Sequence, residues 1–403
     1  MKTNWRKNIR VFTIDSILQW FYPAIVVWVL IWRTYLSFTE ITLIMGVGLF
    51  VSLLLELPSG ALADMIGRKK TVIIGRVCGV IGFALYGVSN NFWLFMVANI
   101  FYHANWAFES GALSALLYDS LKENGKEKEW YQKTEANTFF WCTIGLAVAS
   151  VTGGYLYRFN LHLPYMVSLI PAMGALIGAF YLEEPAIDTE KFSFRAYIRQ
   201  NIEGAMHIVR NKLIGAISLF SILIEFIAYV GLWYLYEPRL AEGGFAAASM
   251  GLLVAGTYLV RALGTKLIHM VTQKLSDRHI PIFLTVLQTV GSGLSYVEGK
   301  FGAISSVYVR KFSDGFRKPI LTRLQNDEMD SRYRATALSA IALFSNLFIS
   351  IAGLFVGKMQ DSVGSAKTLG LFFWIGIFTA LPAAWYLYAM IKSGSETDLD
   401  KRK

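Results

Sequence analysis

The sequence predicts an all-α integral membrane protein with about twelve transmembrane helices arranged in two six-helix halves. Of its 403 residues, 55% are hydrophobic and only 16% are charged, whereas about 25% of the residues of a typical soluble domain are charged. Twelve helices of about 20 residues would occupy roughly 240 residues, which agrees with this apolar content. The remainder is too scattered for a soluble domain of about 100 residues. The composition therefore excludes a soluble enzyme and a disordered regulator.

Twelve apolar segments follow one another along the chain. The first is longer than a signal-peptide core and has no cleavage site of small residues, so we expect it to be retained as a helix. The fourth and tenth contain polar residues, which makes their ends less distinct. The segments cover residues 11–32, 40–62, 71–89, 92–118, 136–157, 163–182, 213–236, 246–270, 280–298, 301–323, 336–358 and 366–391.

Basic residues gather in alternate connections between these segments, which predicts the orientation of the chain. One side would carry the clusters within 2–10, 68–70, 122–133, 191–210, 274–278, 332–334 and 392–403. The opposite side would carry little more than Arg33, Arg158, Arg239, Lys300 and Lys367. Because basic loops stay in the cytoplasm, we expect a multi-pass protein of the cell membrane with both termini cytoplasmic. The net charge of +10 then reflects topology and not a nucleic-acid partner.

The longest polar stretch, 183–212, lies between the sixth and seventh segments. Its apolar residues recur at spacings of three and four among Lys, Arg and Glu, which predicts an amphipathic helix on the membrane surface. The chain would therefore divide into an N-terminal half at 1–182, a cytoplasmic linker at 183–212 and a C-terminal half at 213–403. A weak internal repeat, in which Gly111 corresponds to Gly315 and Gly153 to Gly353, supports a duplication of the kind found in secondary transporters.

Neither cofactor nor metal chemistry is indicated by the sequence. Cys78 and Cys142 lie inside apolar segments, without metal-ligand spacing around them. We find no His/Glu metal motif, no glycine-rich phosphate loop and no serine nucleophile elbow. The protein is thus expected not to be an enzyme, and any pumping must draw on a gradient of protons or other ions.

Residues 60–70 form a distinctive connection between the second and third segments, Gly-Ala-Leu-Ala-Asp-Met-Ile-Gly-Arg-Lys-Lys. Glycines at both ends permit a tight turn and a close helix approach, and the acidic side chain can face the positive end of a helix. The loop resembles the signature loop of the major facilitator superfamily, Gly-x-x-x-Asp-x-x-Gly-Arg-Lys/Arg-Lys/Arg, in both composition and position. The resemblance implies the superfamily fold and gating roles for Gly60, Asp64, Gly67, Arg68 and Lys69. The alternative is a topology signal alone.

Two further patterns favour export. The fifth segment, from Gly145 to Gly154, is similar to the exporter motif Gly-x-x-x-Gly-Pro-x-x-Gly-Gly, although alanine and serine replace the second glycine and the proline. Small residues also serve ordinary helix packing. Residues 110–122 and 56–60 resemble a bacterial branch related to drug and macrolide efflux proteins. The arginine that exporters carry in helix four is absent, since Ala107 stands there, which places their usual proton relay in doubt.

Ionisable residues inside the apolar segments are candidates for coupling or substrate binding, because each costs at least about 2.5–3.5 kcal/mol at the membrane centre. By the resemblance, helices one, four, seven and ten line the central cavity. Spacings of three or four place the polar residues of each of these segments on one helix face. They are Asp15 and Gln19; Asn105 and Glu109; Glu225 and Tyr229; and Arg310, Asp314 and Arg317. Glu56 and Arg261 are further charges in the second and eighth segments.

Glu225 is the leading candidate for a proton-coupling or cation-binding carboxyl. It lies about 18 Å into its segment at 1.5 Å per residue, and no basic residue stands within one turn of it in the sequence. The alternative is an ion pair across helices with Arg261 or Arg310. For Asp314 we expect a structural pair with Arg310 or Arg317, and for Glu109 a gating role is also open.

These observations favour proton-coupled efflux of small amphipathic or cationic compounds by alternating access. The main alternative is proton-coupled uptake of a sugar or another metabolite on the same fold. A membrane-embedded enzyme or a lipid-handling protein is a third reading. The expected partners are a small-molecule substrate and the lipid bilayer, and the resemblance implies a monomer.

Overall fold

The computed structural model is all-helical and describes residues 3–186, 208–329 and 334–400, together with Arg199, Ile202 and Met206. No strand occurs within these ranges. The chain separates into two compact units. The first comprises 1–194 and 246–255, and the second comprises 195–245 and 256–403. The amphipathic helix expected within 183–212 falls largely outside the described residues.

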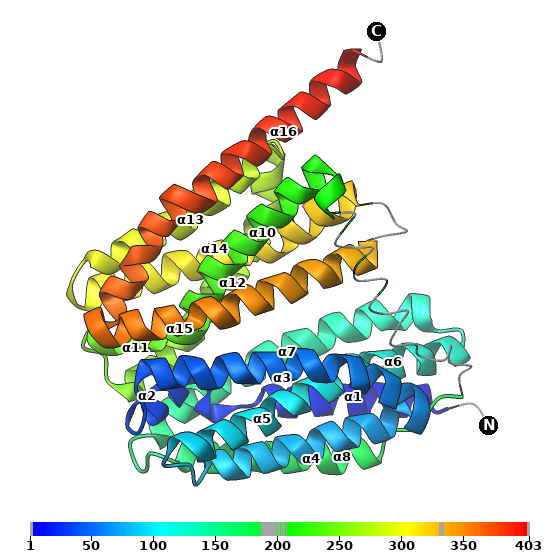
Figure 1. The fold of residues 1–403 in the computed structure, drawn as a ribbon. Coiled ribbons are helices and arrows are strands. Elements are labelled where there is room, and N and C mark those ends of the chain that lie inside the picture. The colour runs from blue at the N-terminus through cyan, green and yellow to red at the C-terminus, as the bar shows by residue number, and fades with distance from the viewer. Residues whose placement is uncertain are drawn as a thin grey trace. The chain divides into compact units, whose positions relative to one another are not determined.

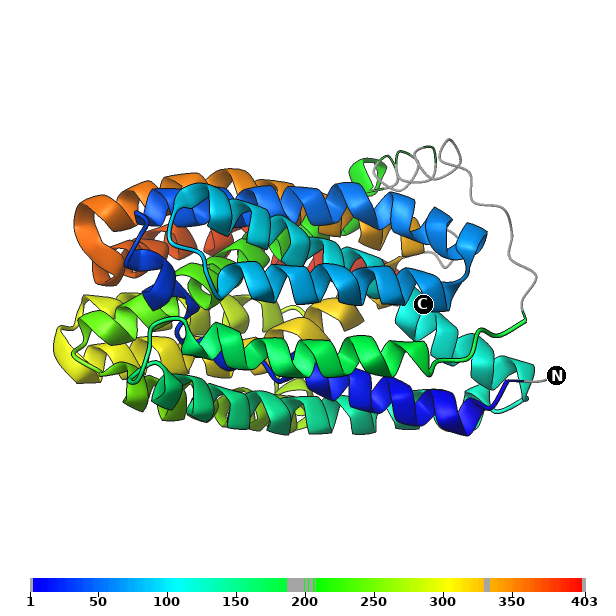
Figure 2. The same cartoon turned by 90° about the horizontal axis from the view of Figure 1, so that it is seen from below.

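The first unit is a bundle of long helices that run side by side, coloured blue to teal in Figure 1. In Figure 2, α8 lies alongside α1. Local signals fix several helix ends: Ser37 and Glu40 form a capping box at the start of α3, and Asn91 caps α5. The helices are α1 (Trp5–Trp20), α2 (Trp28–Arg33), α3 (Phe38–Ile66), α4 (Arg68–Tyr86), α5 (Phe92–Glu109), α6 (Ala112–Glu123), α7 (Glu127–Leu156) and α8 (Leu163–Phe180), with a 3-10 turn at Pro23–Val26.

The second unit is also a helix bundle, and two of its helices contain wide π turns, at Gly231–Leu235 and Gly376–Ala380. The α-helices are α10 (Lys212–Val230), α11 (Tyr236–Glu242), α12 (Ala247–Lys274), α13 (Ile280–Gly293), α14 (Gly299–Glu328), α15 (Arg334–Ile375) and α16 (Leu381–Asp400). The residues of α12 before Gly256 are assigned to the first unit. A 3-10 turn, Leu294–Tyr296, follows α13. Residues of α15 on either side of Gly364 form two helices, because this glycine has a φ of +84° and interrupts the helical backbone.

Within the described residues, six helical stretches are long and apolar enough to cross a membrane. They are Phe38–Glu56, Glu127–Leu156, Leu163–Phe180, Lys212–Glu242, Ala247–Lys274 and Ala340–Ile391. Other expected segments are interrupted: the first breaks near Pro23, and the fourth breaks at Ser110 and Gly111. Twelve spans therefore remain a prediction.

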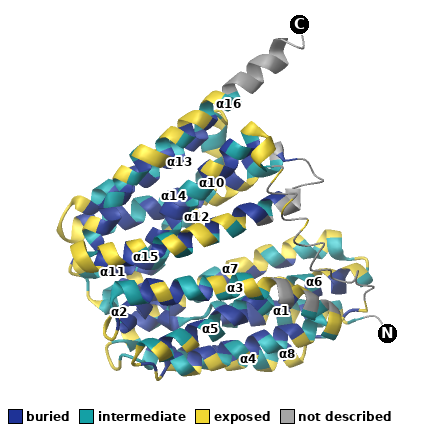
Figure 3. Ribbon diagram, viewed as in Figure 1, coloured by how far each residue is buried: buried dark blue, intermediate teal, exposed yellow. Residues whose placement is uncertain are grey.

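Large apolar side chains occur both inside and outside each bundle. Figure 3 shows exposed residues along the outer faces of the helices and buried residues between them. One core cluster of the first unit joins α1, α4, α6 and α8 through Phe12, Val72, Leu117 and Ala179. Exposed residues such as Phe140 and Ile177, 56% and 60% exposed, suit a surface whose solvent is lipid.

Candidate functional site

Arg76 is the centre of a buried polar cluster in the first unit. Its Nε donates to Asp15 Oδ1 at 2.9 Å, and its Nη1 donates to Glu109 Oε2 at 2.7 Å. A second contact joins Arg76 Nη2 to Asp15 Oδ2. Arg76 Nη1 also donates to Asn105 Oδ1 at 3.1 Å, and Asn105 Nδ2 donates to Gln19 Oε1 at 3.2 Å. The structure thus joins two of the pairs predicted on single helix faces, through an arginine that we did not single out in the sequence.

Small residues on α4 allow the close helix approach that this cluster requires. Gly75 and Gly79 lie one turn apart on the side of α4 that faces α5. A Cβ atom on Gly79 would lie 3.0 Å from Asn105 Oδ1, and one on Gly75 would lie 3.2 Å from the Asn105 carbonyl oxygen. Larger residues here would push α5 away, so the glycines hold Asn105 and Glu109 within reach of Arg76.

The cluster carries one excess negative charge when all its groups are ionised, because Asp15 and Glu109 share one guanidinium. The side chains of Arg76 and Asp15 are fully buried, and that of Glu109 is 13% exposed. A net charge in a low-dielectric interior is costly. Binding one proton removes it, and Glu109 is the carboxyl with the better access to solvent.

A similar arrangement occurs in the second unit around Arg317 of α14. Arg317 forms ion pairs with Glu225 of α10 and with Asp314, the latter at 3.3 Å. Gln288 Nε2 of α13 donates to Asp314 Oδ1 at 3.0 Å. Here too, two carboxylates from two helices share one arginine.

This arrangement changes the interpretation of Glu225. We expected it either to lack a basic competitor or to pair with Arg261 or Arg310, and its partner is Arg317 instead. The two residues are far apart in the sequence and come together only when α10 packs against α14. Glu225 remains 32% exposed, so it is the more accessible carboxyl of this cluster.

Arg310 is held by neutral oxygens and has no carboxylate partner among the described residues. Its Nε donates to the Tyr236 hydroxyl at 3.1 Å, and its Nη atoms contact Ser292 Oγ and the Ile227 carbonyl. In a continuous α-helix this carbonyl would accept the N–H of Gly231, but that N–H bonds to the Ala228 carbonyl instead, at the point where the π turn Gly231–Leu235 begins. Arg310 therefore fills a gap in the hydrogen bonding of α10.

Two ionisable residues near Arg310 were also missed in the sequence. Lys311 of α14 and Glu237 of α11 are 5% and 7% exposed. Lys311 lies inside the tenth apolar segment, where the rule applied to the other charges would have identified it. Glu237 lies one residue beyond the seventh segment as predicted, which is why it was passed over.

The signature loop is a short turn between α3 and α4. Gly67 has a φ of +99° and separates the two helices, whereas Gly60 lies inside α3 and not at the turn as expected. Arg68 forms an ion pair with Asp119 of α6 and donates to the Ala115 carbonyl at 2.8 Å. The side chain of Asp64 is outside the part of the chain that the structure describes.

Two consecutive glutamates after α8 bind the starts of two other helices. The Glu184 carboxylate accepts the backbone N–H groups of Arg68 and Lys69 at 2.7 and 2.6 Å, so it caps α4. Glu183 accepts the Asn4 backbone N–H at 2.8 Å and Lys7 Nζ at 2.9 Å at the start of α1.

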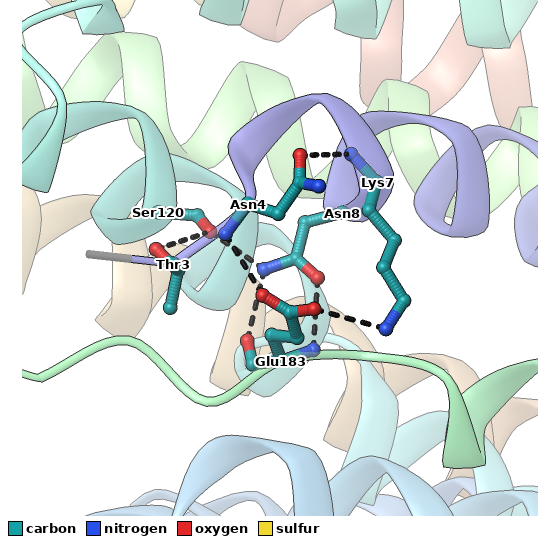
Figure 4. A network of polar contacts seen from close by, with 6 residues as sticks. All are labelled: Thr3, Asn4, Lys7, Asn8, Ser120 and Glu183. Atoms are coloured by element: carbon teal, nitrogen blue, oxygen red, sulfur yellow. Dashed lines mark hydrogen bonds and ion pairs between the residues drawn. The ribbon is translucent and has the colours of Figure 1, made fainter. Parts of the chain in front are cut away.

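Figure 4 shows the contacts around Glu183, in which Asn8 also takes part. Asn8 Oδ1 accepts the Glu183 backbone N–H at 2.9 Å, and Asn8 Nδ2 donates to Ser120 Oγ at 2.6 Å. The pKa of Glu183 is held below its ordinary value by the backbone hydrogen bond from Asn4 and by Lys7. The end of α8 is thereby tied to α1 and α6.

Three other predicted residues lie outside these clusters. Glu56 is exposed on α3, and Arg261 is half-buried on α12 without an ion-pair partner among the described residues. The ring of Tyr229 lies 5.9 Å from that of Trp233.

Comparison with known proteins gives a family match and distant relatives. The model of the Major Facilitator Superfamily matches residues 11–353. The uncharacterized MFS-type transporter YxaM of Bacillus subtilis is 20% identical over 387 residues, covering 92% of each chain. Tetracycline resistance protein, class D, of Salmonella ordonez is 22% identical over 207 residues, which are 51% of this chain and 50% of that protein. Multidrug resistance protein 2 of Bacillus subtilis is 21% identical and covers 52% of each.

Solved transporters share the fold. The nucleoside transporter NupG superimposes with a TM-score of 0.74 at 14% identity, covering 97% of this chain and 100% of that chain. A D-xylose-proton symporter superimposes with a TM-score of 0.67 at 15% identity, covering 96% and 97%. At these identities the likeness concerns the fold alone.

Proposed function

The chain belongs to the major facilitator superfamily, and from this premise we propose that it is a proton-coupled transporter that exports small amphipathic or cationic compounds. Members of this family carry small molecules across a lipid bilayer, so the protein is a membrane transporter and not an enzyme. We propose twelve spans in two halves, cytoplasmic termini and a monomer. Transport would proceed by alternating access around a site at mid-membrane, driven by an ion gradient.

The observation that carries the proton-coupling proposal is the cluster of Asp15, Arg76 and Glu109. Arg76 of α4 supplies a buried cation, which the fourth predicted segment lacks at Ala107. One guanidinium neutralises only one of the two carboxylates that contact it, so one negative charge is left over when both are ionised. The cluster is therefore suited to exist in two charge states that differ by one proton.

We propose that Glu109 accepts and releases this proton. With Glu109 ionised, Arg76 is shared between it and Asp15. With Glu109 protonated, Arg76 pairs with Asp15 alone and α5 loses its ion pair to α4. A proton thus changes a helix contact directly, which is what coupling to a conformational change requires. Glu225, which shares Arg317 with Asp314, is the second candidate by the same reasoning.

The export direction is supported by sequence. Small residues occupy the exporter positions of the fifth segment, and two relatives are named for tetracycline and multidrug resistance. We extend the proposal to the drug and macrolide efflux branch on the strength of residues 56–60 and 110–122. Uptake of a sugar or another metabolite is the second candidate, favoured by the fold likeness to a nucleoside transporter and a D-xylose-proton symporter.

Transport in everted membrane vesicles with an imposed proton gradient tests the proposal. A panel of cationic dyes and antibiotics would be offered to the native protein and to Glu109→Gln, Glu225→Gln and Asp64→Asn variants. Glu129, 63% exposed on α7, provides the matched control as Glu129→Gln. We expect gradient-driven accumulation that is lost in Glu109→Gln and in the gating variant Asp64→Asn, and kept in the control.

The outcomes separate the candidates. Full proton-driven transport by Glu109→Gln would refute its role, and loss in Glu225→Gln alone would move that role to the second unit. Accumulation of a metabolite by right-side-out vesicles, with none of the panel in everted ones, would favour uptake.

A further inference from the structure

Lys311 and Glu237 form an unusual pair of buried charges in the second unit. The two residues are 5% and 7% exposed, which places them among the least exposed ionisable residues that the structure describes. They attract one another electrostatically but form no ion pair. Taking a charge out of water without a partner is costly, so two such groups side by side require an explanation.

Neither group finds its hydrogen-bond partners in the described part of the chain. Glu237 Oε2 is buried and accepts no hydrogen bond. Lys311 Nζ donates to no described acceptor, although an ammonium has three N–H donors. The neighbouring Arg310, by contrast, has three oxygen acceptors. Arg310 is thus satisfied by its surroundings, whereas Lys311 and Glu237 Oε2 beside it are not.

Aromatic rings border the same place. Lys311 Nζ lies 5.5 Å from the ring centroid of Tyr236 and 5.6 Å from that of Tyr258. The ring of Tyr236 is fixed through its hydroxyl, which accepts from Arg310. Two rings from α11 and α12 thus stand beside an ammonium of α14, and such rings attract both cations and flat apolar groups.

We propose that Lys311, Glu237, Tyr236 and Tyr258 form a substrate subsite for a small zwitterion that carries an apolar ring. The carboxylate of the substrate would accept hydrogen bonds from Lys311, and its ammonium would donate to Glu237. Its ring would pack against the two tyrosines. This assignment rests on the proposed transport function and narrows its substrate class.

Charge balance favours a zwitterion over singly charged compounds. Lys311 and Glu237 cancel one another, so a zwitterion satisfies both without adding net charge to the interior. A lone anion would leave Glu237 without a donor and close to a like charge, and a lone cation would do the same to Lys311. A neutral alcohol could bond to both groups but would offer no opposite charge to either.

Four related probes test this assignment on the full-length protein in lipid nanodiscs. Phenylalanine carries both charges, 3-phenylpropionate only the carboxylate, phenethylamine only the ammonium, and 3-phenylpropanol neither. Equilibrium binding would be measured by competition against radiolabelled phenylalanine. We expect phenylalanine to bind roughly 10- to 100-fold more tightly than each of the others, the range of one or more charge-assisted hydrogen bonds.

Variants assign each charge to its residue. In Lys311→Gln, the preference for phenylalanine over phenethylamine should collapse. In Glu237→Gln, the preference for phenylalanine over 3-phenylpropionate should collapse. Lys318→Gln, on the exposed side of the same helix, is the matched control and should bind like the native protein. Tyr258→Leu should weaken all four probes together, which gives a second test should a charge variant fail to fold.

The failure of this assignment is distinct from failure of the proposed function. The Glu109→Gln variant should lose proton-driven transport and keep phenylalanine binding. Absence of saturable phenylalanine binding, or equal probe preferences in Lys311→Gln and the native protein, would overturn the subsite and leave the proton-coupling proposal intact. A binding preference that changes only in Lys318→Gln would overturn it as well.

Discussion

Replacing Arg76 with methionine isolates the energetic role of the arginine in the first unit. Methionine has a similar length and is apolar, so packing between α4 and α5 changes little. The side chain of Asp15 has no exposure and loses its cation, whereas Glu109, at 13% exposure, retains some access to solvent. The cost is therefore that of breaking one buried ion pair, about 3–5 kcal/mol of unfolding free energy.

Neutralising the whole cluster provides the decisive comparison. In the triple variant Asp15→Asn, Arg76→Met, Glu109→Gln, no charge is left unpaired, so most of the lost stability should return. Unfolding of the purified protein in detergent, followed by tryptophan fluorescence, measures both changes. Arg10→Met, an exposed arginine on α1, is the control and should change stability by less than about 1 kcal/mol. A triple variant as unstable as the single one would refute the reasoning.

Three further predictions concern helix geometry and helix ends. Gly231→Ala should cost about 1–3 kcal/mol, because its Cβ would lie 2.9 Å from the ring of Tyr236; Gly178→Ala, with open space around it, should be neutral or slightly stabilising in the same unfolding assay. Glu184→Gln should cost about 0.5–2 kcal/mol through a weaker cap on α4, and faster amide exchange at the first turn of α4 would show it, whereas unchanged exchange would contradict the cap. Because contacts in the folded state lower the pKa of Glu183, its ionised carboxylate stabilises the fold at pH values above its ordinary pKa of 4.5. This stabilisation is lost as the pH falls through the lower pKa of the folded state. In the same unfolding assay, Glu183→Gln should therefore be less stable than the native protein at neutral pH, and the difference should shrink in acid.

The helical architecture was largely predictable, because apolar segments of about 20 residues in a row predict membrane helices. Apolar content does not predict where a helix is interrupted. The first predicted segment continues past Pro23 in the sequence, yet the chain turns there, and the seventh contains a π turn with no proline at all. Apolar composition is the same in a straight and a broken helix, so only local backbone geometry reveals the difference.

The candidate site was predictable in part. Spacings of four placed Asp15 with Gln19 and Asn105 with Glu109 on single helix faces. Arg76 was not predicted, although it lies inside the third predicted segment, because the family resemblance associates helices one, four, seven and ten with the cavity and not helix three. The rule that an intramembrane charge needs a partner applies to every segment, and it would have found Arg76.

Pairing between helices is a different matter. Glu225 meets Arg317 because α10 packs beside α14, and neither periodicity nor composition encodes which helices are neighbours. The repeat between the two halves was too weak to reveal that each unit places two carboxylates on one arginine. A sequence can therefore identify the charged residues of such a protein more readily than the partners of each charge.

The π turn at Gly231–Leu235 has a consequence for the rotational register of the seventh helix. A π turn accommodates one residue more than an α turn, so rewinding it to α geometry would rotate the following segment by about 100° about its axis. Glu237 would then swing away from Lys311. A regular α-helix through Gly231 would also direct the Gly231 N–H to the Ile227 carbonyl, which now accepts from Arg310. The hydrogen bond from Arg310 of α14 to the end of α10 thus links the winding of the seventh helix to the rotational position of α11, and hence to whether Glu237 lies near Lys311.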